Sequence, residues 1–96
     1  MKRDFTLEIL AENNFSILNR IVNVLNRRRV RIKKLMAHEN DGDFKNGAAI
    51  LLLHTTDEMI NKVKPQLEKL IEVENVRCFE GNSAYIELSE RVVDVD

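Results

Sequence analysis

The residues best suited to chemistry lie in a short polar turn, Asn13-Asn14-Phe15-Ser16, between a strand-like pattern and a helix-like pattern. The first turn of a helix carries backbone N–H groups without intrahelical partners, and asparagine tolerates the left-handed conformations of such turns. This corner therefore suits a small anion or a partner. A plain turn closed by Ser16 as a helix cap is the alternative. Because no nucleophile, general base or metal ligand accompanies the turn, we expect binding rather than catalysis.

The other chemically capable side chains are isolated. His38 and His54 are separated by a hairpin and lack a third ligand, so we expect no metal site. Cys78 lies in a strand pattern without a nearby histidine, which favours a buried small apolar side chain over a reactive thiol. Asp41 and Asp43 form a polar turn without calcium-loop spacing. No catalytic residue and no cofactor is therefore expected.

A basic cluster follows the first helix pattern. Six of the eight positions from 27 to 34 are basic: Arg27, Arg28, Arg29, Arg31, Lys33 and Lys34. Such a pattern can contact phosphates, so an RNA-binding module is one alternative. The run at 48–53 lacks the aromatics on which RNA-recognition sheets stack bases. We therefore favour a solvated helix end, or a docking patch for an acidic partner, and expect no nucleic-acid binding.

Length and composition indicate one small globular domain. The chain has 96 residues, is 44% hydrophobic and 32% charged, and carries a formal charge of -1. Its single cysteine excludes an internal disulfide and fits a reducing compartment. No apolar stretch approaches the roughly 20 residues of a membrane helix, and the N-terminal segment lacks the apolar region of a signal peptide. We expect a cytoplasmic protein without membrane contact.

Hydrophobic periodicity in the first half predicts a strand, a helix and a second strand. Apolar residues alternate over 5–9, recur at helical spacing over 16–28, and continue in a strand-like segment at 30–39. The parity of the last segment changes, which indicates a bulge near Lys33 and Lys34. A hairpin loop is then expected from Asn40 through Gly47.

The second half repeats this order. Residues 48–53 are apolar on both parities, typical of a central strand covered on both faces. Thr55 or Thr56 begins a second helix that we expect to reach Ile71. Pro65 predicts either a kink in this helix or a later start to its regular part. Residues 73–79 form a fourth strand. We expect one domain over 1–80 and an extension over 81–96, with a short extra strand at 84–88 and an acidic tail from 89 to 96.

The order βαββαβ predicts an α+β, ferredoxin-like fold, with a four-stranded antiparallel sheet and two helices on one face. The opposite face would be open, yet the strand at 48–53 is apolar on both sides. Self-association is the simplest way to bury it, and we therefore expect a homodimer.

The residues at the corner also carry a family resemblance. The segment Ala11-Glu12-Asn13-Asn14-Phe15-Ser16-Ile17-Leu18-Asn19-Arg20-Ile21, with the basic helix end and a strand at Ile32, resembles the opening of an ACT domain. It is similar in particular to the regulatory small subunit of acetolactate synthase. Residues 67–73 are similar to the end of the second helix in that subunit. The resemblance covers about residues 4–79.

The resemblance implies a non-catalytic, dimeric domain that binds valine, leucine or isoleucine at the dimer interface. It would modulate the thiamine-diphosphate-dependent catalytic large subunit of acetolactate synthase, in branched-chain amino-acid synthesis. A stand-alone amino-acid-binding ACT protein is an alternative. The ligand-binding residues that it implies are Asn13, Asn14, Phe15, Ser16, Ile17, Leu18, Arg31 and Ile32.

Two of these positions depart from the family pattern. Ser16 stands where amino-acid-sensing members usually carry glycine, and Arg31 stands where they carry asparagine. If these changes remove the pocket, the domain would activate its partner constitutively by docking on it.

Overall fold

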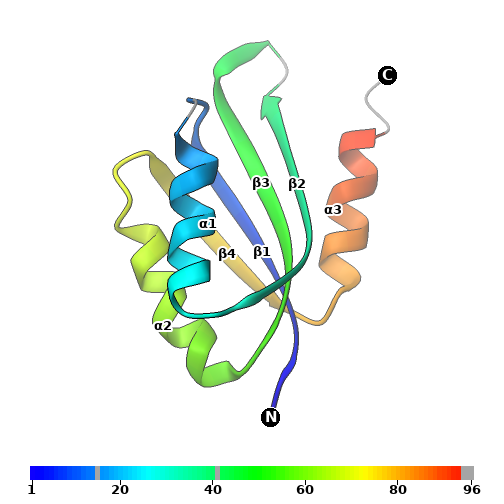
Figure 1. Ribbon diagram of the computed structural model, residues 1–96. Coiled ribbons are helices and arrows are strands. Elements are labelled where there is room, and N and C mark those ends of the chain that lie inside the picture. Colours follow the sequence, from blue (N-terminus) through cyan, green and yellow to red (C-terminus); the bar gives the residue numbers. More distant parts are fainter. Residues whose placement is uncertain (15, 41, 94–96) are drawn as a thin grey trace.

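The computed structural model describes residues 1–14, 16–40 and 42–93 and contains one four-stranded antiparallel sheet of order β2-β3-β1-β4 (Figure 1). The elements are β1 (Arg3–Glu12), α1 (Ile17–Arg27), β2 (Arg31–Asn40), β3 (Asp43–Thr55), α2 (Asp57–Glu68), β4 (Val73–Glu80) and α3 (Ser83–Val93). The predicted ferredoxin-like order βαββαβ is confirmed over β1 to β4.

Helices α1 and α2 lie on one face of the sheet and enclose the main core. On the sheet side, Leu7 and Leu51 are fully buried, and on the helix side Leu25 and Leu67 are fully buried. The side chains at i, i+4 and i+8 of α1, namely Ile17, Ile21 and Leu25, form its buried stripe. This stripe is what the sequence periodicity predicts.

The bulge predicted in β2 is confirmed. The pairing register between β2 and β3 shifts between Ile32 and Lys34, so that Ile32 faces Leu53 and Lys34 faces Leu52. The extra residue returns Leu35 and Ala37 to the same side of the sheet as Ile32. That side is the one covered by α1 and α2.

The hairpin between β2 and β3 is tighter than expected. Strand β3 begins at Asp43, which pairs with Asn40, and the register then shifts so that Glu39 pairs with Gly47. Residues 44–47 belong to β3 and not to a loop. Helix α2 begins as predicted, because the Thr56 side chain accepts a bond from the Met59 N–H at 3.1 Å. It ends at Glu68 instead of Ile71, and Ile71 is 91% exposed.

The prediction of a short strand at 84–88 is wrong. Residues 84–88 belong to helix α3, which lies apart from α1 and α2 (Figure 1) and packs on the other face of the sheet. Tyr85, Leu88 and Val92 contact a cluster that includes Ile50 and Leu52 of β3. Their spacing of three and four residues is helical, although the run Ala84, Ile86, Leu88 alternates like a strand. Of the predicted acidic tail, residues 89–93 are helical and 94–96 lie outside the described residues.

Helix α3 changes the argument for a homodimer. Ile50 and Leu52 are 1% and 4% exposed, and Tyr85 of the same chain, 7% exposed, lies in the same apolar cluster. The second apolar face of β3 is therefore buried within one chain, and covering it does not require a partner.

Candidate functional site

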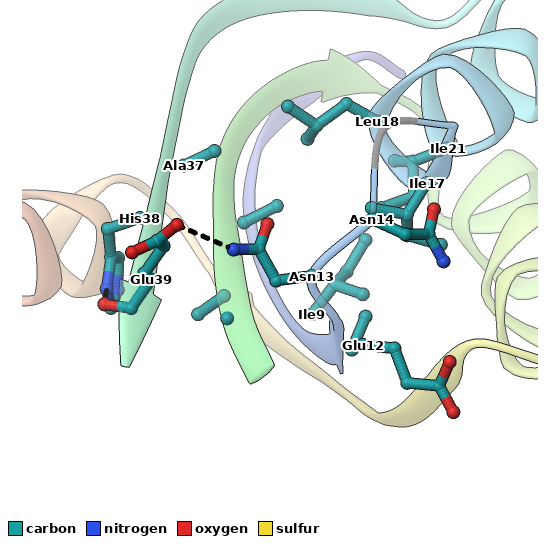
Figure 2. Close-up of a pocket in the computed structure, with 14 residues that line it drawn as sticks. Ile9, Glu12, Asn13, Asn14, Ile17, Leu18, Ile21, Ala37, His38 and Glu39 are labelled. Atoms are coloured by element: carbon teal, nitrogen blue, oxygen red, sulfur yellow. Dashed lines mark hydrogen bonds between the residues drawn. The ribbon is translucent and has the colours of Figure 1, made fainter. Parts of the chain in front are cut away.

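A cavity of about 200 Å³ lies where the β1–α1 corner meets the paired ends of β2 and β3 (Figure 2). Its apolar lining residues are Ile9, Ala11, Ile17, Leu18, Ile21, Ala37, Ala48 and Ala49. Its polar lining residues are Glu12, Asn13, Asn14, His38 and Glu39, with Gly47 completing the wall. An apolar interior with a few polar groups is the usual composition of a small-molecule site.

Small residues on the two paired strands keep this space open. Ala37 pairs with Ala49 in register and Gly47 lies opposite Glu39, so Ala37, Ala49 and Gly47 add little side-chain bulk to this wall. Gly47 has a second reason to be glycine: a Cβ there would lie 2.6 Å from the His38 carbonyl oxygen. A larger residue at 47 would push β2 away from β3 beside the cavity.

Asn13 ties the corner to the β2–β3 hairpin. Its Nδ2 donates to Glu39 Oε1 at 3.0 Å and to the Phe44 carbonyl oxygen at 2.9 Å, while its backbone N–H donates to the Lys45 carbonyl oxygen at 2.7 Å. The two side-chain bonds use both amide hydrogens, which fixes the orientation of the amide. Asn13 Oδ1 has no partner among the residues that the structure describes, and Figure 2 shows it turned away from Glu39.

Among the residues that the structure describes, none compensates the N-terminus of α1 at this cavity. Ser16 occupies the N-cap position without a side-chain bond to the helix, and its hydroxyl donates instead to Asn14 Oδ1 at 3.1 Å. The first turn contains no acidic residue. By contrast, α2 has the Thr56 cap and two acidic residues in its first turn. The free N–H groups and the positive end of the helix dipole at α1 can accept a carboxylate.

Four of the residues implied by the family resemblance line the cavity: Asn13, Asn14, Ile17 and Leu18. Ser16 adjoins it at the helix cap, and Phe15 lies outside the described residues. Arg31 and Ile32 do not join the cavity. They begin β2, whereas Ala37 to Glu39 near its other end form the wall, and Arg31 to Glu39 spans roughly 26 Å of strand. Ile32 packs against the main core instead.

Glu39, Ala37 and the segment 47–49 are lining residues that the sequence analysis missed. The signal for them is the register of β2 on β3, which shifts between Glu39 and Asn40 and places Glu39 opposite Gly47 and Ala37 opposite Ala49. The sequence analysis assigned Gly47 to the hairpin loop and did not predict this register.

The basic cluster does not form one continuous surface. Lys33 Nζ lies 3.1 Å from Asp4 Oδ2, and Lys34 Nζ lies 5.9 Å from the centre of the Tyr85 ring, on the face of the sheet that α3 covers. Arg27 and Arg28 flank a groove between α1 and α2. The division weakens the RNA alternative, because a nucleic-acid backbone needs cations in a continuous row or patch.

The two histidines do not face each other. His54 pairs in register with Arg31, and His38 pairs with Ala48. His54 Nδ1 lies 2.8 Å from Asp4 Oδ1, and these contacts from His54 and then Lys33 hold the pKa of Asp4 below its usual value. Within residues 1–14, 16–40 and 42–93 no group of three or more His, Cys, Asp or Glu side chains is placed to hold a metal ion.

The sequence matches the profile of one protein family. A sequence profile of the ACT domain matches residues 14–76. A search of curated protein sequences found no match. No helix in the described part of the chain is both long and apolar enough to cross a membrane.

Solved structures with the same fold include the ACT domain of GTP pyrophosphokinase from Chlorobium tepidum, with TM-score 0.70 and 15% identity. The match covers 82% of this chain and 100% of that one. The acetolactate synthase small subunit from Thermotoga maritima matches with TM-score 0.69 and 21% identity over 79% of this chain and 47% of that one. A homoserine dehydrogenase from Thiobacillus denitrificans matches with TM-score 0.70 and 18% identity over 83% of this chain and 17% of that one.

Proposed function

Because the chain belongs to the ACT domain family, whose members are regulatory and non-catalytic, we propose that it binds a small aliphatic amino acid and thereby regulates a partner enzyme. The observation that carries this proposal is the cavity itself: about 200 Å³ of mostly apolar space beside the uncompensated N-terminus of α1. Sites for drug-sized ligands occupy about 300–1,000 Å³. A single amino acid suits the smaller volume.

The two ends of such a ligand match the two kinds of surface in the cavity. Its carboxylate would lie against the first-turn N–H groups of α1, where Ser16 makes no cap bond and no acidic side chain competes. Its aliphatic side chain would contact Ile17 and Ile21 on the helix and Ala49 on the sheet. This arrangement supports valine, leucine or isoleucine as the effector.

The partner that we propose is the thiamine-diphosphate-dependent catalytic subunit of acetolactate synthase. The support is the fold shared with an acetolactate synthase small subunit, together with the resemblance of residues 11–21 to the opening of that subunit. The proposed location is the cytoplasm. An amino acid would act by binding one regulatory state better than the other.

We also propose that the regulatory unit is a homodimer. Strand β2 is at the edge of the sheet, so the backbone groups on its outer side are open to pairing with a second strand. Leu35 on this strand is 42% exposed. Light scattering coupled to size-exclusion chromatography measures the mass of the particle directly. A monomeric mass at about 100 µM protein would contradict this part of the proposal.

A thermal-shift scan of the full chain against the twenty amino acids tests the ligand. A ligand present at 100 times its Kd stabilises the folded state by about 2.7 kcal/mol, and only valine, leucine or isoleucine should do so. Ala37→Leu should abolish the thermal shift. Ala37 is exposed on the cavity wall, so the longer side chain fills the cavity without crowding the core. Ala37→Ser keeps the size of the side chain and is the matched control. Absence of any shift in the wild-type chain would refute amino-acid binding.

Mixing the chain with an acetolactate synthase catalytic subunit tests the partner. A change in acetolactate formation that depends on the bound amino acid supports the regulatory role. Amino-acid binding without any effect on the catalytic subunit would instead favour the stand-alone amino-acid-binding protein.

A further inference from the structure

The polar groups at the mouth of the cavity are one-sided in charge. None of the described residues that line it is a lysine or an arginine, whereas Glu12 and Glu39 both lie at its edge. Asn13 adds another acceptor, because its two amide hydrogens are already bound to Glu39 Oε1 and to the Phe44 carbonyl oxygen. The oxygens available to a ligand at this end, on Glu39 and on Asn13, only accept hydrogen bonds.

Of the two carboxylates, Glu39 is the one held at the mouth. Its Oε1 accepts from Asn13 Nδ2 at 3.0 Å, which joins β2 to the β1–α1 corner across the opening. Figure 2 shows the Glu39 carboxylate facing Asn13, whereas the Glu12 carboxylate points away from it. Glu12 thus has the same charge as Glu39 and lies near it, but its carboxylate does not face Asn13.

We propose that Glu39 is the specificity-determining residue of the site and that it selects ligands bearing a primary ammonium group. This inference rests on the proposed function, because it names the group of the bound amino acid that Glu39 recognises. The ammonium group donates to the Glu39 carboxylate and to Asn13 Oδ1. A 2-oxo acid with the same carbon skeleton offers an acceptor at that position, so its oxygen meets the negative charge of Glu39 and the acceptor oxygen of Asn13.

The size of the discrimination follows from the chemistry of the contact. Hydrogen bonds to a charged group contribute about 1.5–3 kcal/mol, which corresponds to roughly 10- to 100-fold in Kd. The free protein presents the acceptors already oriented, because the Asn13 amide is fixed by its bonds to Glu39 and Phe44. An ammonium group can bind without displacing either bond.

The test compares Glu39→Gln with Glu12→Gln in the full chain. Glutamine at position 39 keeps a side-chain oxygen that can accept from Asn13, removes the negative charge and replaces the second oxygen with an NH2 donor. Both residues are exposed, so we expect both variants to fold, and far-UV circular dichroism with urea unfolding checks this. Calorimetric titration uses L-valine and 3-methyl-2-oxobutanoate, or the amino acid that shifts most in the thermal scan and its own 2-oxo acid.

The wild-type chain should bind the amino acid at least about tenfold more tightly than the 2-oxo acid. Glu39→Gln should weaken amino-acid binding about 10- to 100-fold, leave 2-oxo acid binding equal or tighter, and so remove the preference. Glu12→Gln should change neither Kd by more than about twofold.

An unchanged preference in Glu39→Gln, or equal losses in both variants, overturns the inference while the proposed amino-acid site stands. Equal wild-type affinity for the amino acid and the 2-oxo acid also overturns it. If the wild-type chain binds neither compound nor any amino acid in the scan, the proposed function fails together with the inference.

Discussion

The replacement of Leu52 by alanine tests whether α3 covers the second face of the sheet in solution. Leu52 is 4% exposed and lies in the cluster with Tyr85, away from the main core. Leu→Ala removes three carbon groups at about 0.8 kcal/mol each, so the transfer term alone is about 2.4 kcal/mol. The cavity left behind adds to this, and the total expected loss in the free energy of unfolding is about 2–5 kcal/mol.

The assay is urea unfolding followed by far-UV circular dichroism, with two control variants. Leu53→Ala should cost a similar amount, because Leu53 is fully buried between the sheet and α1 and α2. Leu35→Ala should cost less than about 1 kcal/mol, because Leu35 is 42% exposed. A loss below about 1 kcal/mol for Leu52→Ala, beside the full loss for Leu53→Ala, would refute the packing of α3 on this face.

Three further predictions concern other parts of the molecule. Gly47→Ala should lower the free energy of unfolding in urea by about 1–3 kcal/mol, because the new Cβ meets the His38 carbonyl oxygen; wild-type stability would refute this. The Asp4 carboxyl, whose pKa His54 and Lys33 lower, should stabilise the fold above about pH 4 and lose that effect as the pH falls through its folded pKa. Thermal unfolding of Asp4→Asn should therefore depend less on pH in the acid range, and an identical acid limb would contradict the contact. Burial raises the pKa of Cys78, so at pH 8 its thiol should react with a disulfide reagent more slowly in the folded chain than in urea; equal rates would count against burial.

Local periodicity accounts for the parts of the fold that could be predicted. The alternation that includes Leu7 and the helical spacing that includes Ile21 each reflect burial on a single face, which the sequence records directly. The bulge at Lys33 was visible for the same reason, as a change of parity. The prediction for the segment containing Tyr85 failed. Its apolar residues fit both the strand period and the helix period, and only its contact with Leu52 decides between them.

The site was predictable on one wall and not on the other. Asn13 and Ile17 were found because the corner between strand and helix is a local feature of the sequence. Glu39 reaches the same cavity only through the register of β2 on β3, which depends on the turn and on the register shift between Glu39 and Asn40. Arg31 follows α1 closely in sequence, yet it begins a strand whose other end forms the wall of the cavity.

The same hydrogen bonds that define the site suggest how ligand binding in the cavity can change the binding of a partner. Asn13 makes three bonds to the hairpin, to Glu39, to Phe44 and to Lys45, so a ligand held by Glu39 changes the free energy of the corner and the hairpin together. Phe44, at the start of β3, is 71% exposed and able to contact another protein. A partner that binds one arrangement of the hairpin better than another must, by linkage, alter the affinity for the ligand by the same factor. Phe44→Ala should therefore weaken the effect of the amino acid on the partner while leaving amino-acid binding to the isolated chain intact. Loss of both would place Phe44 in the ligand site, and loss of neither would exclude the hairpin as the route.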